Sequence, residues 1–311
     1  MSSLLARFAM NIFWLGRSLE RAENIARILH VNATYGRDDP QGPDWGRVLR
    51  LYADEERFLE KHSKIDAASV LGFYFIDRDN PTSISSSILS ARQNARSVRH
   101  LISTEMWAHL NIFSSEVGKV DAKELSLTNL ANIATSVIKG CQTFEGITEG
   151  TFLRSQAWRF YHIGRYLERA DQMTRILDIG YDRLLLSKSD AVSAVQWNLL
   201  LRSVSAYHAY RSKHPGFTHP HEIAGFLLYD KEFPRAVVLC VDRLSAHLRD
   251  IERQYGIDRG PEVEKSLRAL EFSLETGPGQ ELTPMKLHMF LDGVQVALGN
   301  VSTAIDGTYF K

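Results

Sequence analysis

Apolar residues recur at alternating steps of four and three along the first part of the chain. At about 100° per residue, this spacing gathers them on one stripe of a helix. The pattern predicts a long amphipathic helix over residues 4–35, which ends at a loop rich in glycine, aspartate and proline at residues 36–43. The apolar stripe consists of Phe8, Ile12, Leu15, Leu19, Ala22, Ala26 and Leu29.

The same kind of pattern continues to the end of the chain and predicts an all-α protein, a multi-helix bundle or array. Prolines at positions 81, 234, 261 and 284 stand where predicted helices begin, because a missing N–H costs no hydrogen bond there. Two short apolar runs, residues 71–76 and 226–229, fit a helix or a strand, and we assign both to helices because no other strand is predicted to pair with them. The further predicted helices cover residues 45–62, 67–76, 81–112, 122–146, 151–186, 191–213, 220–228, 234–255, 261–274 and 284–309.

The chain also contains an internal repeat. Residues 13–29 match residues 161–177 with nine identities, and both segments contain Gly-Arg-x-Leu-Glu-Arg-Ala, at residues 16–22 and 164–170. Further matches in the same order predict a tandem duplication. We expect one domain, residues 1–311, made of two pseudo-twofold-related helical repeats, approximately 1–150 and 151–311. The further matches pair Trp45 with Trp197, Lys61-His62 with Lys213-His214, Gly72-Phe73 with Gly225-Phe226, Asp77 with Asp230, and Pro81 with Pro234.

Composition and charge narrow the function classes. The chain has 37 Lys and Arg residues against 37 Asp and Glu residues, so no positive excess favours nucleic acid. Cys141 and Cys240 lie in apolar helical segments far apart in the sequence, which predicts buried thiols in a reducing compartment. The sequence has no pattern typical of a leader peptide and no apolar run of about 20 residues. We therefore expect a cytoplasmic protein that binds neither nucleic acid nor a membrane.

Each copy of the signature places a polar stripe on its helix, roughly opposite the apolar stripe. The spacing i, i+3, i+4 and i+7 brings the members of the stripe onto one face. Large apolar residues share that face in both copies, so we expect it to be covered rather than solvated. The stripe comprises Arg17, Glu20, Arg21 and Asn24 in the first copy and Arg165, Glu168, Arg169 and Gln172 in the second.

Three interpretations of the polar stripes are open. The charged side chains can form buried salt bridges between the two signature helices, which fix register more than they add stability. The arginines can instead line a cleft and hold a carboxylate or phosphate through paired hydrogen bonds. In the third interpretation, Glu20 or Glu168 is a catalytic carboxylate.

A second candidate site is a basic stretch around residues 91–107. On one continuous helix, Arg92, Arg96 and Arg99 occupy neighbouring turns, and Ser103 and Glu105 follow. Such a stripe can recognise an anion or simply face solvent. The corresponding segment near residues 234–248 is more apolar, which is the asymmetry expected when one copy of a duplicated scaffold specialises.

Motifs for metals and cofactors are weak or absent. The loop that contains His214, His219 and His221 is dense in imidazole, but nothing nearby supplies a fourth ligand, so we expect no metal. The sequence has no Gly-rich phosphate loop, no dinucleotide-binding fingerprint and no serine-hydrolase motif. We expect no cofactor, and no catalytic residue is assigned.

Four separated segments, in order, resemble the bacterial Alpha-E domain family over essentially the whole chain. That family is all-helical and is named for a Glu-Arg motif, which Glu20-Arg21 and Glu168-Arg169 match. The resemblance implies a partnership with a circularly permuted ATP-grasp protein in a system for peptide synthesis or modification. The segments read ARFAMNIFWLGRSLERAENIARILHVN, ARQNARSVRHLISTEMWAHLN, AWRFYHIGRYLERADQMTRILD and GFLLYDKEFPRAV.

Three functional hypotheses follow. The first is a non-catalytic helical accessory protein that docks an ATP-grasp ligase and binds a peptide or amino-acid substrate at the arginine-lined stripe. The second is an enzyme acting on amides or peptides, with Glu20 or Glu168 as general base and neighbouring arginines polarising a carbonyl. The third is an oligomeric structural scaffold, which the neutral net charge and abundant apolar residues permit.

Overall fold

The structure, a computed structural model, describes residues 4–36, 42–185, 190–216, 219–277 and 283–311, without the side chains of residues 182–193. Within these ranges it contains fourteen helices and no strand, which confirms the all-α prediction. The helices are α1 (Ala6–Tyr35), α2 (Trp45–Tyr52), α3 (Glu55–Leu59), α4 (Ala67–Phe75), α5 (Ile84–Ser97), α6 (Thr104–Val117), α7 (Leu130–Thr151), α8 (Gln156–Leu185), α9 (Asp190–Ser203), α10 (Tyr207–Lys213), α11 (Pro220–Tyr229), α12 (Val237–Tyr255), α13 (Gly260–Thr276) and α14 (Pro284–Tyr309).

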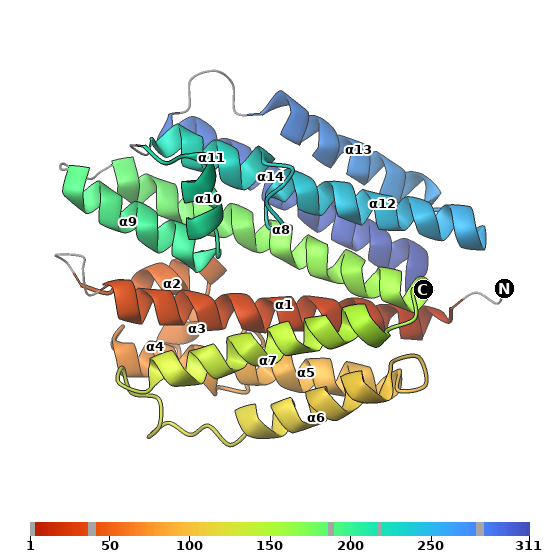
Figure 1. The fold of residues 1–311 in the computed structure, drawn as a ribbon, viewed down its shortest axis with the longest axis horizontal. Coiled ribbons are helices and arrows are strands. Elements are labelled where there is room, and N and C mark those ends of the chain that lie inside the picture. Colours follow the sequence, from red (N-terminus) through yellow and green to blue (C-terminus); the bar gives the residue numbers. More distant parts are fainter. Residues whose placement is uncertain (1–3, 37–41, 186–189, 217–218, 278–282) are drawn as a thin grey trace. The chain divides into compact units, whose positions relative to one another are not determined.

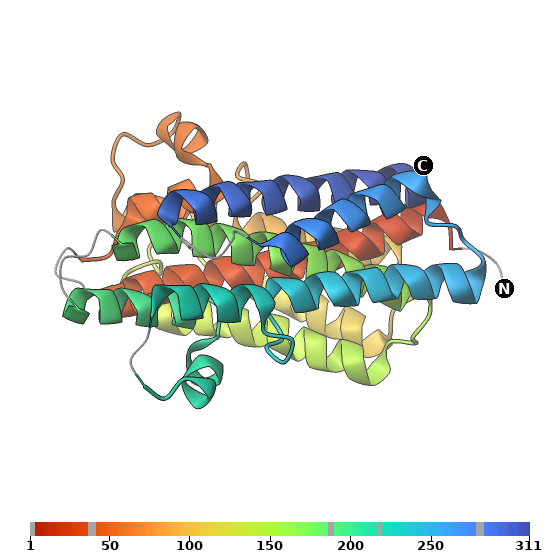
Figure 2. The same cartoon turned by 90° about the horizontal axis from the view of Figure 1, so that it is seen from above.

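The chain divides into two compact units. Unit 1 consists of Met1–Arg17, Leu153–Leu185 and Ala209–Lys311. In this unit α8 packs against α12 and α14, and α13 packs against α14, so its long helices run side by side (Figures 1 and 2). The interior contains rows of buried Leu, Val and Ile from each of these helices, spaced three or four residues apart.

Unit 2 consists of Ser18–Phe152 and Leu186–His208. Within it, α5 packs on α6 and α6 on α7, while α2 contacts α3 and α4. Each unit takes segments from both sequence repeats, so the units do not coincide with residues 1–150 and 151–311. The expectation of a single domain stays a prediction.

Two helices that the sequence predicted as continuous are interrupted at single residues. Residues 45–62 break at Ala53 (φ 51°), and residues 191–213 break at Ser205 (φ 58°). A left-handed residue cannot continue a right-handed helix, and its N–H bonds back to the carbonyl three residues earlier, Arg50 and Arg202 respectively. Neither alanine nor serine signals a helix end, so the sequence analysis was wrong at both positions.

The helix predicted over residues 81–112 is also wrong. Helix α5 ends at Ser97, and α6 begins at Thr104 because the Ser103 hydroxyl accepts a hydrogen bond from the N–H of Met106 at 3.1 Å. Pro81 and Pro234 lie three residues before α5 and α12, so those two predicted helix starts were early. Prolines 220, 261 and 284 lie in the first turns of their helices. The apolar runs at 71–76 and 226–229 fall largely in α4 and α11, which confirms their assignment to helices.

The series of helices is similar in the two halves of the sequence. A 30-residue helix opens each half, a short apolar helix (α4, α11) follows an interrupted pair, and a long helix (α7, α14) closes it. The two interruptions, at positions 53 and 205, are 152 residues apart, the same offset as several of the sequence matches. The pseudo-twofold relation between the halves nevertheless stays a prediction.

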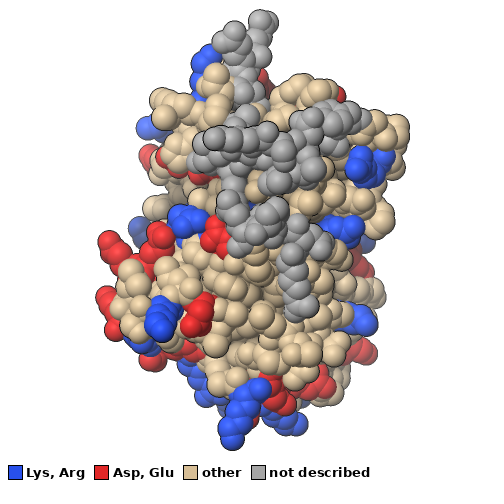
Figure 3. Space-filling model, turned by 90° about the vertical axis from the view of Figure 1, so that its left-hand side faces the viewer, with Lys and Arg blue, Asp and Glu red and all other residues tan. Residues whose placement is uncertain are grey.

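The described residues can be checked for membrane-spanning helices, for the distribution of surface charge and for the burial of the two cysteines. No helix among the described residues is long and apolar enough to cross a bilayer. On the face drawn in Figure 3, basic and acidic side chains lie interspersed over the described residues. Cys141 and Cys240 are buried and form no disulfide, as the sequence predicted. Burial raises the pKa of the Cys141 thiol well above its ordinary value, so that thiol stays protonated.

Candidate functional site

The signature glycines mark a close contact between α1 and α8 inside unit 1. A Cβ atom on Gly16 would lie 2.2 Å from the carbonyl oxygen of Tyr161, and one on Gly164 would lie 2.1 Å from the carbonyl oxygen of Phe13. Phe13 and Tyr161 occupy the same position in the two copies of the signature. The contact is therefore reciprocal, and only glycine lets the two backbones approach this closely.

The carboxylate of the second Glu-Arg pair, Glu168, is buried at this contact. The Glu168 side chain is 1% exposed, and its Oε2 atom lies 2.8 Å from Nε of Arg17. The amide of Gln172 donates to Oε1 of Glu168 at 3.4 Å. Arg17 also donates to the Ser302 hydroxyl at 3.1 Å and lies over the ring of Trp14, 4.9 Å from its centroid. Both oxygens of the carboxylate thus have protein partners.

The first Glu-Arg pair, in unit 2, shows a similar local contact. Glu20 is 3% exposed, and the amide of Asn24 donates to its Oε1 atom at 3.5 Å. This contact has the same four-residue spacing as the contact between Gln172 and Glu168. Glu20 also lies close enough to Cys141 for its charge to raise the pKa of that buried thiol. Both glutamates of the signature are therefore interior groups.

The remaining arginines of the polar stripes are less uniform. Arg169 is 6% exposed and donates to the carbonyl of Pro234 at 3.4 Å. Arg21 and Arg165 are partly exposed. In unit 1, Arg17, Glu168, Arg169 and Gln172 therefore contact neighbouring helices or one another, which is the geometry of a structural seam rather than of an open cleft.

A cluster of aromatic and imidazole rings lies beside the seam in unit 1. The rings of Trp158 and His162 from α8 lie 4.2 Å apart with a tilt of 55°, and His247 from α12 lies 5.6 Å from His162 and 5.9 Å from Tyr166. Burial lowers the pKa of His162 to about 2 and that of His247 to about 4, so both rings are neutral at pH 7. The sequence analysis missed this cluster, although Trp158, His162 and Tyr166 are spaced by four residues.

The basic stripe is not a row along one helix. Arg92 lies in α5, Arg99 follows the end of α5, and Trp107 lies in α6. Both guanidinium groups lie over the Trp107 ring, at 5.7 and 5.4 Å from its centroid, and Arg92 donates to Asn111 at 2.7 Å. Arg96 is exposed on the last turn of α5, and Glu105 is exposed on the first turn of α6. Arg92 and Arg96 lie on neighbouring turns of α5, but the predicted continuation through Arg99 to the following residues was wrong, because the chain turns at residues 98–103.

The three histidines of the imidazole-rich loop have separate surroundings. His214 stacks on Tyr210 at 4.6 Å and lies 6.3 Å from Phe226, which makes it a packing residue. His219 is the N-cap residue of α11, and His221 stacks on it at 5.5 Å. Where three side chains that could bind one metal ion lie close together among the described residues, none of these histidines is among them.

The packing of His214 has a counterpart in unit 2. His62 stacks on Phe58 at 4.6 Å and lies 6.2 Å from Phe73. Lys61 pairs with Asp77 and Asp79, as Lys213 pairs with Asp230 and Glu232. The matched residues Lys-His and Asp thus perform the same packing and pairing in two places. Their repetition in the sequence has a structural explanation.

Comparison with known proteins agrees with these features. Residues 4–310 match Alpha-E, described as a predicted alpha-helical domain with a conserved ER motif. An uncharacterized protein of Mycobacterium bovis and two of Mycobacterium tuberculosis are each 24% identical to the chain over 330 residues. The matched region covers 97% of this chain and 36% of each relative, so the chain spans about a third of their length. No solved structure matches. Because the match extends over nearly all residues and includes both Glu-Arg pairs, the chain belongs to the Alpha-E family.

Proposed function

We propose that this chain is a non-catalytic helical binding module that works in the cytoplasm with a circularly permuted ATP-grasp ligase, in a system that makes or modifies amide bonds. The observation that carries the proposal is the length of the relatives, in which the matched region is 36% of the chain. A domain that forms a third of a larger polypeptide acts beside other domains. The resemblance to the Alpha-E family supplies the kind of neighbour.

The surroundings of the Glu-Arg pairs support the non-catalytic part of the proposal. A general base must reach the proton that it abstracts directly or through one water. Glu168 is 1% exposed and already bonded to Arg17 and Gln172, and Glu20 is 3% exposed. These carboxylates are better placed to hold helices together than to meet a substrate, so the amide-hydrolysing or amide-forming alternative has no geometric support from them.

Co-purification tests the docking part directly. The full chain and the circularly permuted ATP-grasp protein of the same organism are mixed and analysed by size-exclusion chromatography with light scattering, with and without Mg-ATP and a mixture of amino acids. We expect a complex whose mass is the sum of the two chains. An unrelated ATP-grasp ligase is the control and should elute separately. If the cognate pair does not associate even with nucleotide and amino acids present, the docking proposal is wrong.

The same measurement addresses the scaffold hypothesis. The mass of the chain alone gives its oligomeric state. A large homo-oligomer that does not change when the ligase is added would favour a structural scaffold over a partner module.

A further inference from the structure

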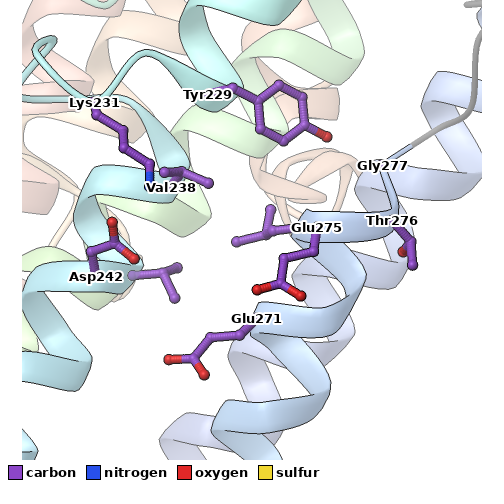
Figure 4. A pocket seen from close by; sticks show the side chains of 10 residues that line it. Tyr229, Lys231, Val238, Asp242, Glu271, Glu275, Thr276 and Gly277 are labelled. Atoms are coloured by element: carbon purple, nitrogen blue, oxygen red, sulfur yellow. The ribbon is translucent and has the colours of Figure 1, made fainter.

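An open pocket lies in unit 1 between α12 and α13, beside the turn that follows α11 (Figure 4). Its volume is about 670 Å³, inside the range of roughly 300–1,000 Å³ that is usual for small-molecule sites. Val238 and Val241 from α12 and Leu274 from α13 supply its apolar part. The pocket contains no residue of the Glu-Arg signature.

Three carboxylates line this pocket, Asp242 from α12 and Glu271 and Glu275 from α13 (Figure 4). Within the part of the chain that the structure describes, neither Asp242 nor Glu275 has an ion-pair or hydrogen-bond partner. Glu271 accepts a hydrogen bond at 2.8 Å from Ser245, which is only 1% exposed, so a buried hydroxyl orients this carboxylate. The pocket therefore presents three acidic groups, of which the protein has fixed one in place.

Two further polar groups face the same space. Lys231 approaches from the turn after α11 (Figure 4) and pairs with no carboxylate among the described residues. The Tyr229 hydroxyl is buried and has no hydrogen-bond partner there either. Burial raises the pKa of Tyr229 to about 12, so the phenol stays neutral and can accept or donate one hydrogen bond. One ammonium against three carboxylates leaves the pocket with two unbalanced negative charges.

Elsewhere in unit 1, two pairs of carboxylates each share one basic partner. Asp230 and Glu232 share Lys213, and Glu252 and Glu264 share Arg259. Like charges that face one pocket repel one another, and a cation bound between them relieves that repulsion. The position of Asp242 corresponds, at the offset of 153 that pairs Pro81 with Pro234, to Leu89 in the first repeat. The aspartate at this position is therefore present in the second repeat alone.

We propose that this pocket binds an organic cation, a primary amine or guanidinium group on a short aliphatic stem. The cationic head lies among Asp242, Glu271 and Glu275, and the stem covers Val241 and Leu274. Lys231 can hold a carboxylate if the ligand carries one, as a basic amino acid does. The proposal goes beyond the partner role above and does not require it, because binding is a property of this chain alone.

The test uses probes with aliphatic stems of similar length and different charges: a dication, a neutral alcohol and an anion. The full chain is titrated with agmatine, 1-pentanol and pentanoate, and binding is followed by calorimetry and by ¹H–¹⁵N NMR shifts. We expect saturable binding of agmatine only, with a dissociation constant on the order of 1 mM. Shifts should concentrate on α12 and α13. Absence of saturable agmatine binding, or equal binding of pentanol, would overturn the proposal.

Matched variants test whether binding depends on the carboxylates of the pocket or on the overall charge of the protein. The double change Asp242→Asn with Glu275→Gln should weaken agmatine binding at least about tenfold, since it removes two of three counter-charges. The control double change, Glu262→Gln with Asp306→Asn, removes two exposed carboxylates of α13 and α14 outside this pocket and should leave affinity unchanged. Equal weakening by both pairs would mean that only the overall charge of the protein matters, and the site would be wrong.

A change of opposite sign keeps the test decisive if the double variant does not fold. Lys231→Ala removes a like charge on an exposed turn residue, so agmatine binding should tighten about threefold. Weaker binding by Lys231→Ala would contradict the arrangement of charges proposed here.

Discussion

Unit 1 contains carboxylates in two opposite settings. Glu168 on α8 is 1% exposed, and Arg17 and Gln172 contact both of its oxygens. Glu275 on α13 is exposed beside a pocket and, among the described residues, pairs with no cation. The charge of Glu168 is compensated inside the protein, and the charge of Glu275 is left to solvent or a ligand. The conspicuous signature thus contributes buried contacts between helices, whereas the proposed binding site lies in a region without a conspicuous sequence pattern.

Gly164→Ala should cause the largest loss of stability, and it tests whether the signature is needed for the packing of α1 on α8. The new Cβ would lie 2.1 Å from the carbonyl oxygen of Phe13, which is backbone and cannot rotate away, so α1 and α8 must separate. We expect the free energy of unfolding to fall by about 3 kcal/mol or more, measured by urea denaturation.

Gly299→Ala is the matched control for this change. Gly299 lies in α14 and has nothing within 4 Å of the position that its Cβ would take. Alanine favours a helix over glycine, so this variant should be more stable by about 0.5–1 kcal/mol. If both variants lose stability equally, the close contact of the two helices is not what requires glycine at position 164.

Glu168→Ala should lower the free energy of unfolding by about 3 kcal/mol, because it leaves the Arg17 guanidinium without its main partner in a largely buried place. Glu168→Gln keeps two hydrogen-bonding atoms and should lose less. Both values are obtained from denaturant unfolding, and cellular function is scored in parallel.

The exposed ion pair of Glu232 with Lys213 provides the control for Glu168. The Glu232 side chain is 82% exposed and Lys213 keeps Asp230 as a partner, so Glu232→Ala should cost less than about 0.5 kcal/mol. A catalytic role for Glu168 would show itself differently: Glu168→Gln would abolish cellular function while the protein stayed folded. That result would overturn the structural interpretation of the signature.

The helices could be read from the sequence better than their breaks. The steps of three and four residues located every long helix, since a helix that packs on its neighbours must bury one stripe. Ala53, Ser205 and the turn at residues 98–103 were missed, because tertiary contacts and caps determine them and neither alanine nor serine is a strong stop signal. Ser103, which caps α6, was interpreted instead as a member of a basic stripe.

The sequence analysis placed its candidate site at the signature and had none near the pocket, for a related reason. Repetition made Glu20 and Glu168 prominent, but repetition reports what both halves need, and both halves need packing. The pocket near Asp242 and Glu275 is lined by residues from two helices and a turn, so no pattern within one segment of the sequence predicts it. The only sequence signal was a difference between the repeats, Asp242 against Leu89.

The pH dependence of the free energy of unfolding tests whether His247 on α12 is buried, whereas Asp242 on the same helix lines the open pocket. Burial, followed by the charge of Arg159, lowers the pKa of His247 to about 4, against roughly 6.5 in an unfolded chain. The unfolded state therefore binds the proton more tightly. The stabilising effect is fully present above about pH 6.5 and is lost as the pH falls towards 4, by about 3 kcal/mol in total.

His247→Phe should remove this dependence while it keeps a ring in the stack with His162. The measurement compares the free energy of unfolding of the variant and the unaltered protein at pH 7 and pH 4.5, so that carboxylates common to both cancel. His208→Phe, at an exposed position, is the control and should follow the unaltered protein. Parallel curves for the unaltered protein and His247→Phe would mean that the ring is solvated in the folded state.

The smallest expected effect concerns the local hydrogen bond that each copy of the signature makes to its glutamate. Gln172 donates to Glu168 at 3.4 Å, and Asn24 donates to Glu20 at 3.5 Å, both across one helical turn. Each bond is long, so Gln172→Ala and Asn24→Ala should each cost only about 1 kcal/mol in denaturant unfolding. Equal losses would mean that the two copies keep the same local role. A loss confined to Gln172→Ala would show that the seam in unit 1, where Arg17 from the other signature helix also contacts Glu168, depends on this local bond more than unit 2 depends on the bond between Asn24 and Glu20.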